Sequence, residues 1–204
     1  MSGRWARDDF AHDSRELAPR LLGQVLVHVV RGKRRAGRIV EVEAYCGHED
    51  DCSHAYSGVP TDRTRPMFGP PGLAYVYISY GVHRCMNVVC GVEGAASAVL
   101  VRALEPLEGI DAMRRARAAG RPRRDTDLCS GPGKLGQAMG IGTARSGEDM
   151  VSSPRLWVEH GPRPAGGDVA RSARIGMNPA AAWAEEPLRW YDGRSAHVSR
   201  RSTR

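Results

Sequence analysis

Apolar and polar residues alternate along several short stretches of the chain, which is the pattern of half-buried β-strands. Strands are predicted at residues 24–30, 37–45, 73–80, 85–92, 96–103, 156–160 and 188–191. The turn at 31–34 joins the first two as a hairpin. Helical spacing predicts helices from Ser14, over 107–119 and over 134–140. The pattern indicates an α+β fold, a single mixed domain around a curved, mostly antiparallel sheet with peripheral helices.

The strand predicted at 37–45 has an unusual face, because alternation places two carboxylates and an aromatic ring together: Glu41, Glu43 and Tyr45. The pattern alone favours a solvated strand face. The alternative is functional, with one glutamate acting as a general base beside a stacking ring.

Tyrosines gather in the next predicted strand, where Tyr75 and Tyr77 share a face and Tyr80 begins a turn with Gly81. Packing in an aromatic core is the commoner fate of such residues. A platform on which nucleic-acid bases stack is the alternative, since it needs flat rings at the edge of a groove.

Two polar residues interrupt predicted apolar strands. Asn87 needs hydrogen-bond partners if it is buried, and it is either structural or a polar gate that selects a ligand. Arg102 follows a run of small and aliphatic residues and needs a carboxylate partner. Glu41, Glu43 and Glu105 are the candidates for that partner.

Charge changes this picture more than composition does. The 204 residues carry a formal charge of +7, and lysine occurs only at Lys33 and Lys134, so the basic residues are nearly all arginine. A basic surface with forked donors suits phosphate, although charge alone fits a solvated face equally well. No apolar run reaches membrane length and the N-terminus lacks the apolar stretch of a signal peptide, so we expect a cytoplasmic protein without membrane contact.

Five cysteines with no CxxC pair argue against a disulfide scaffold. Cys46, His48, Cys52 and His54 lie close together in sequence, and a metal-dependent hydrolase that uses them is one alternative function. Their spacing matches no common zinc pattern.

Several motifs, in order along residues 17–192, resemble those of the 3-methyladenine (alkyladenine) DNA glycosylases. The stretches are LLGQVL at 21–26, IVEVEAY at 39–45, SHA at 53–55, MFGPPG at 67–72, YVY at 75–77, YGVHRCMNVV at 80–89, VLVRALEP at 99–106, LCSGPGKL at 128–135 and PLRWY at 187–191. Gly133 stands where many relatives carry serine or alanine. The ordered set is far more specific than any one motif.

The resemblance implies catalytic and base-binding roles. Glu43 matches the base that activates the attacking water, and Arg102 matches the partner that helps to hold it. The walls that stack on a flipped base are implied to be Tyr45, His54 and Tyr77.

It also implies residues for base selection and DNA contact. Asn87 matches a gate that clashes with the exocyclic amine of normal guanine. Tyr80 matches a wedge that enters the duplex and fills the vacated space. Met67 is expected at the DNA surface, together with Arg63 and Arg65 of the same loop.

The implied activity is release of alkylated or deaminated purines from double-stranded DNA by hydrolysis of the N-glycosidic bond, at the start of base-excision repair. It implies no metal and no organic cofactor, and we expect a monomer. Strand cleavage requires an amine that forms a Schiff base. Lys33 lies in a predicted turn and Lys134 outside the motifs that form the pocket, which favours a monofunctional enzyme. The other alternative is a non-catalytic damaged-DNA binding protein, which needs neither the base nor its partner.

Three segments follow from this interpretation. Residues 1–13 are expected to be flexible, residues 14–192 to form the glycosylase domain, and residues 193–204 to form a basic C-terminal tail.

Overall fold

The computed structural model describes residues 3–120, 122 and 124–201. Its helices and strands have the following bounds: α1 Arg7–Phe10, α2 Ser14–Leu21, β1 Val25–Val30, β2 Lys33–Tyr45, β3 Ala74–Ser79, β4 His83–Cys90, β5 Ser97–Glu108, α3 Ile110–Ala116, α4 Pro132–Met139, β6 Leu156–Glu159, β7 Val169–Ser172 and β8 Arg189–Asp192. Short 3₁₀ helices fill several of the connections.

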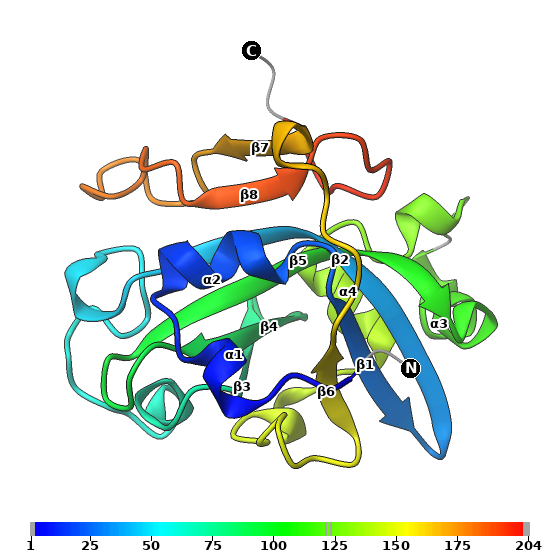
Figure 1. Cartoon of the computed structure of the whole chain (residues 1–204), viewed down its shortest axis with the longest axis horizontal. Coiled ribbons are helices and arrows are strands. Elements are labelled where there is room, and N and C mark those ends of the chain that lie inside the picture. The colour runs from blue at the N-terminus through cyan, green and yellow to red at the C-terminus, as the bar shows by residue number, and fades with distance from the viewer. Residues whose placement is uncertain (1–2, 121, 123, 202–204) are drawn as a thin grey trace.

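The strands form one open antiparallel sheet of eight strands, in the order β3-β4-β5-β2-β1-β6, with β8 pairing to β2 and β7 pairing to β8. Figure 1 shows β2 and β5 as long curved ribbons across the middle of the molecule, with β7 and β8 above α2. This confirms a single mixed α+β domain around a mostly antiparallel sheet. No helix within the described part of the chain has the length and apolar character that a membrane span requires.

Strand β2 holds the sheet together because it pairs along its length with three strands. It meets β1 near its start, β5 along most of its length, and β8 at Glu41, Val42 and Glu43. Glu41 pairs with Ala103 of β5, and the next residue, Val42, pairs with Val101. Arg102 therefore has no partner on β2 and is the extra residue of a β-bulge. Bulges re-aim side chains and are common beside active sites.

One predicted helix begins too early. Leu107 and Glu108 belong to β5, and α3 begins only at Ile110. Gly109 separates the two elements with a left-handed φ of 72°, which glycine adopts without steric penalty. The chain therefore turns out of the sheet before it starts the helix.

The two ends of the chain also differ from expectation. Residues 1–13 were expected to be loose, but Trp5 and Phe10 are buried in the main core and the Trp5 N–H donates to the Val158 carbonyl at 3.0 Å. Residues 1–2 lie outside the described residues, as do 202–204. At the other end, Ser199 of the expected tail donates to the buried Glu41.

Candidate active site

A cavity of about 510 Å³ opens beside the sheet, with walls from β2, β3, β4, β5, the loop after β2, the start of α4 and the segment before β8. Most of the residues singled out from the sequence line it: Tyr45, His54, Met67, Tyr77, Tyr80, Asn87 and Arg102. This volume lies in the range typical of small-molecule sites.

Aromatic rings form one wall. The rings of Tyr75 and Tyr77 stack at 5.5 Å between centroids, and His54 meets Tyr77 edge-on at 4.4 Å. The His54 Nδ1 also lies 2.9 Å from the Tyr75 hydroxyl. Desolvation raises the pKa of Tyr75 to about 12, and desolvation and then the charge of Arg63 lower the pKa of His54. At neutral pH this wall therefore offers uncharged rings.

Two carboxylates lie behind that wall. Glu41 and Glu43 are fully buried, so the solvated strand face favoured by the pattern is wrong. The Arg102 Nε donates to Glu41 Oε1 and its Nη1 to Glu43 Oε2, both at 3.0 Å. Burial acts to lower the pKa of Arg102, but the charges of Glu43 and Glu41 outweigh it and raise the pKa above its usual value. Of the three carboxylates considered as partners, Glu41 and Glu43 are the ones that pair with Arg102; Glu105 lies 3.3 Å from Arg38.

Glu43 accepts hydrogen bonds from three directions. The Ile175 N–H donates to Oε1 at 2.7 Å, and the Tyr45 hydroxyl donates to Oε2 at 3.2 Å beside Arg102. A carboxylate has about four lone-pair sites, so one acceptor position remains. Arg102, Tyr45 and Ile175 all line the cavity, and Glu43 is fully buried directly behind these three donors.

A second buried ion pair fixes the segment that carries Ile175. Arg174 and Asp50 are both fully buried in their side chains, and Nη2 donates to Asp50 Oδ1 at 2.8 Å. The Arg174 guanidinium also lies over the Tyr45 ring at 4.7 Å. The chain around 174–175 is thereby held against β2.

Asn87 is buried on β4 at the cavity wall, and its Nδ2 donates to the Tyr75 carbonyl at 3.0 Å. The side chain therefore has a structural partner and also faces the cavity. Its orientation is set by the neighbouring strand.

Tyr80 lies at the tip of the β3–β4 hairpin and is 87% exposed. Tyr80 and Gly81 both have positive φ, 49° and 73°, which is the requirement of type I′ hairpin turns. A bulky side chain rarely adopts this conformation, and here it raises the ring at the cavity edge.

The loop between β2 and β3 departs from expectation at one residue. Met67 was expected at the DNA surface, but it is 2% exposed and packs with Tyr75 in a small apolar cluster beside the cavity. Arg63 and Arg65 are exposed on the same loop, and Arg65 pairs with Asp62 at 3.0 Å. Neither arginine lines the cavity.

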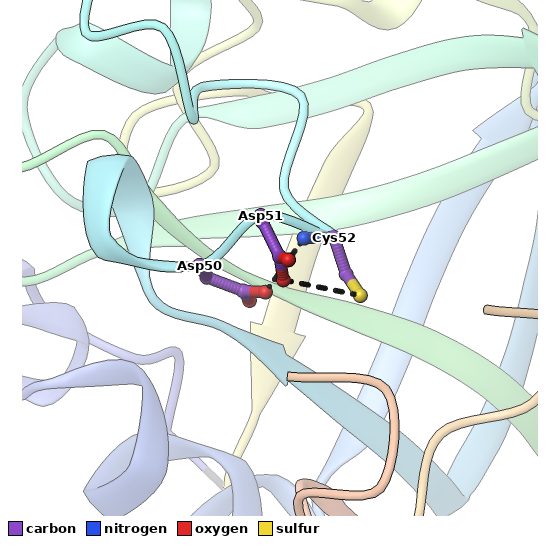
Figure 2. A group of neighbouring side chains, drawn as sticks. All are labelled: Asp50, Asp51 and Cys52. Atoms are coloured by element: carbon purple, nitrogen blue, oxygen red, sulfur yellow. Dashed lines mark hydrogen bonds between the residues drawn. The ribbon is translucent and has the colours of Figure 1, made fainter. Parts of the chain in front are cut away.

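The four residues of the metal hypothesis are not brought together. Among the described residues, the group with suitably close ligand atoms is Asp50, Asp51 and Cys52, drawn in Figure 2. Asp50 is paired with Arg174, and Asp51 accepts from the backbone N–H groups of residues 182 and 183. Cys46, His48 and His54 lie outside this group.

Lys134 lines the cavity, although the sequence placed it outside the pocket motifs. It lies in the first turn of α4, is exposed, and donates to the Ser130 hydroxyl at 3.2 Å. Helix α4 brings it there because its N-terminus abuts the β3–β4 hairpin: a Cβ on Gly133 would lie 2.6 Å from the His83 Nδ1.

Sequence reasoning missed several members of the site. The donors from Ile175 and Ser199 and the Asp50–Arg174 pair come from distant loops without periodicity, so no pattern marks them. Arg189 carried a usable signal, because a charged residue inside an apolar strand pattern needs a buried partner.

Comparison with known proteins adds the remaining evidence. A family model described as methylpurine-DNA glycosylase matches residues 8–196. The DNA-3-methyladenine glycosylase of Mus musculus is 43% identical over 207 residues, which cover 97% of this chain and 62% of the mouse protein. The Homo sapiens protein of that name is 45% identical over 191 residues, which cover 90% of this chain and 63% of the human protein.

A bacterial relative is matched over more of its length. The putative 3-methyladenine DNA glycosylase of Burkholderia cenocepacia is 48% identical over 187 residues, which cover 90% of this chain and 85% of the relative. The chain spans under two thirds of the two mammalian relatives. With residues 8–196 matched to one family model and these identities over most of its length, the chain belongs to the methylpurine-DNA glycosylase family.

Proposed function

We propose that the chain is a DNA glycosylase that takes an alkylated or deaminated purine out of double-stranded DNA and hydrolyses its N-glycosidic bond with one water. The observation that carries the proposal is the buried Glu43–Arg102 pair behind a cavity walled by tyrosine and histidine rings. The family and the names of the relatives support the same reaction class.

The chemical step needs little help at the leaving base. An alkylated purine such as 3-methyladenine already carries a positive charge and departs readily. The protein has to place a water behind the sugar and accept its proton. We assign both tasks to Glu43, with its fourth acceptor site for the water, and assign to Arg102 the hydrogen bond that orients the carboxylate.

The aromatic wall selects and holds the base. Tyr45, His54 and Tyr77 supply stacking surfaces, and base–aromatic stacking contributes about 1–3 kcal/mol per base. Neutral rings suit a cationic purine better than a charged imidazole does. Asn87, held by the Tyr75 carbonyl, acts as the gate against the exocyclic amine of guanine.

Tyr80 inserts into the duplex and fills the gap that the extruded base leaves. Removing a nucleotide from the stack costs a few kcal/mol, and less at a damaged pair. An exposed ring that inserts into the gap offsets part of this cost. Arg63 and Arg65 contact the phosphates from the neighbouring loop, while Met67 supports the cavity wall from within.

The reaction stops at hydrolysis. Lysines that form Schiff bases are activated by an apolar pocket or a neighbouring cation, and Lys134 is exposed and bonded to a serine hydroxyl. Borohydride added during turnover should therefore trap no covalent protein–DNA adduct. The monomer is the simplest assembly for this proposal, because the carboxylate, its arginine and the aromatic wall all come from one chain.

The test is Glu43→Gln, assayed for release of 3-methyladenine from a methylated duplex. We expect the variant to keep its affinity for the duplex and to lose base release by at least about a hundredfold, since general-base catalysis contributes 10²–10⁴. Glu105→Gln, on the neighbouring strand, is the matched control and should release the base normally. Normal release by Glu43→Gln would overturn the catalytic assignment, and absence of release by the unaltered chain would favour a damaged-DNA binding protein.

A further inference from the structure

The second buried carboxylate has contacts that the proposed chemistry does not use. Glu41 is fully buried, and its Oε1 accepts from the Arg102 Nε at 3.0 Å, from the Arg189 Nε at 2.8 Å and from the Ser199 hydroxyl at 2.8 Å. Its Oε2 accepts from the Ser199 N–H at 2.6 Å. Hydrogen-bond donors therefore hold both carboxylate oxygens of Glu41 in place.

These contacts form a chain of alternating charges: Arg189, Glu41, Arg102 and Glu43. Two carboxylates and two guanidiniums balance, which buried charges require. A guanidinium is a rigid planar fork. Once Glu41 fixes the Nε of Arg102, the plane of the fork is fixed and Nη1 is directed at Glu43.

The C-terminal segment completes this chain from outside the sheet. Ser199 lies seven residues beyond the end of β8, and it supplies both a main-chain and a side-chain donor to Glu41. The Arg189 guanidinium in turn donates to the Arg200 carbonyl. Ser199 also lies near Gly131, which lines the cavity, since a Cβ there would be 3.9 Å from the Ser199 Cβ.

We propose that Ser199 is a positioning residue for base release: through Glu41 it sets the orientation of the Arg102 guanidinium and so the alignment of Glu43 with its water. The inference rests on the proposed catalytic roles of Glu43 and Arg102. Ser199 is not among the residues that line the cavity, so it would act through Glu41. Misalignment of about 1 Å at a distance from the reacting atoms slows a reaction by up to 10²-fold.

A purely structural role makes a different prediction. If the segment only anchors the end of the chain, its loss lowers the melting temperature and reduces DNA affinity and base release together. If it positions Arg102, the single-turnover rate at saturating enzyme falls while the dissociation constant for lesion-containing duplex stays the same. The two quantities therefore separate the interpretations.

The experiment uses graded variants of the full chain. Ser199→Ala removes the hydroxyl donor, Ser199→Pro removes both donors because proline has no N–H, and Ser199→Thr keeps both. We expect the single-turnover rate to fall about tenfold in Ser199→Ala, to fall about a hundredfold in Ser199→Pro and to stay unchanged in Ser199→Thr. The affinity for the methylated duplex should stay constant in all three. A chain that ends after Val198 should match Ser199→Pro, and one that ends after Arg201 should match the unaltered chain.

Either of two results would overturn the inference: full rates in both Ser199→Ala and the chain ending after Val198, or parallel losses of rate, affinity and melting temperature. The alanine and threonine variants keep the test valid should the proline variant fail to fold. Glu43→Gln, run in parallel, separates the two proposals. If it stops base release while the Ser199 variants do not slow it, the positioning role alone fails, whereas normal release by Glu43→Gln removes the proposed catalytic role itself.

Discussion

At the scale of single residues, the site depends on matching each buried charge. Glu43 tolerates full burial because it accepts from Arg102, Tyr45 and the Ile175 N–H. A buried carboxylate without such partners would instead become protonated and could not perform the role proposed for Glu43. The same condition applies to Asp50 and Arg174, which hold the Ile175 donor in place.

Asp50→Asn tests that support. The change leaves the buried Arg174 charge without its counter-ion, and breaking a buried pair in this way costs about 3–5 kcal/mol. We expect the free energy of unfolding, measured with urea, to fall by roughly 3 kcal/mol. Asp62→Asn breaks the exposed pair with Arg65 and serves as the control, with an expected loss below about 1 kcal/mol. Equal losses in the two variants would contradict the role assigned to burial.

At the scale of elements, the strands are the part of the fold that sequence predicts well. Alternation locates β1 to β6 and β8, because a half-buried strand imposes a period of two. It misses β7, and it ends β5 at residue 103 instead of Glu108. Alternation does not give the depth of burial, however. Glu41 and Glu43 have the pattern of a solvated face, and the contacts from Ile175 and Ser199 show that this face is covered.

The candidate site was predictable to the extent that its residues lie on strands or in quoted motifs. Glu43, Tyr45, Tyr77, Asn87 and Arg102 are such residues, and the structure brings them to one cavity or to the network behind it. The donors from Ile175 and Ser199 were not predictable, since main-chain N–H groups carry no sequence signal and their position depends on loop closure.

The contact between α4 and the β3–β4 hairpin provides a test at this scale. A side chain at position 133 would meet the His83 ring at 2.6 Å, so Gly133→Ser should lower the free energy of unfolding by about 1–3 kcal/mol through overpacking. Adding His83→Ala should recover part of the loss, because it removes the ring but keeps the His83 Cβ, which lies 2.9 Å from the added Cβ. Thermal or urea unfolding of both single variants and the double variant gives the coupling free energy between positions 133 and 83. Strictly additive changes in the free energy of unfolding would show that the His83 ring moves aside freely.

The hairpin itself is tested by Tyr80→Ser. Because the ring is exposed, its loss should leave the melting temperature nearly unchanged and weaken binding to a duplex with one lesion by roughly tenfold or more, in line with about 1–3 kcal/mol of stacking. Gel shifts measure the affinity, and single-turnover release at saturating enzyme should change less. Val82→Ser at the same tip, also exposed, is the control. Unchanged affinity in Tyr80→Ser would argue against insertion.

At the scale of the whole molecule, stability should depend on pH through a buried histidine. His28 is 5% exposed with its Nδ1 3.0 Å from the Met139 carbonyl, and desolvation lowers its pKa from 6.5. Just below pH 6.5, His28 binds a proton in the unfolded chain but not in the folded chain. The free energy of unfolding is therefore highest above that pH and falls as the pH decreases through it.

Urea unfolding at pH 7.5 and pH 5.5 should therefore give a lower free energy of unfolding at the acidic value. His28→Gln should reduce this difference. Carboxylates whose pKa is lowered, such as Asp149 and Glu159, lose their contribution only in more acidic solution. A pH difference unaffected by His28→Gln would assign the effect to other groups.

The left-handed turn at Tyr80 and Gly81 has a kinetic consequence. The Tyr80 ring is exposed at the cavity edge, and the cost of its left-handed backbone is met during folding. If Tyr80 inserts into DNA as proposed, insertion requires no rearrangement of the hairpin. The slow event at each base pair would then be the opening of the pair, and weakened pairs, which open most often, would be sampled first.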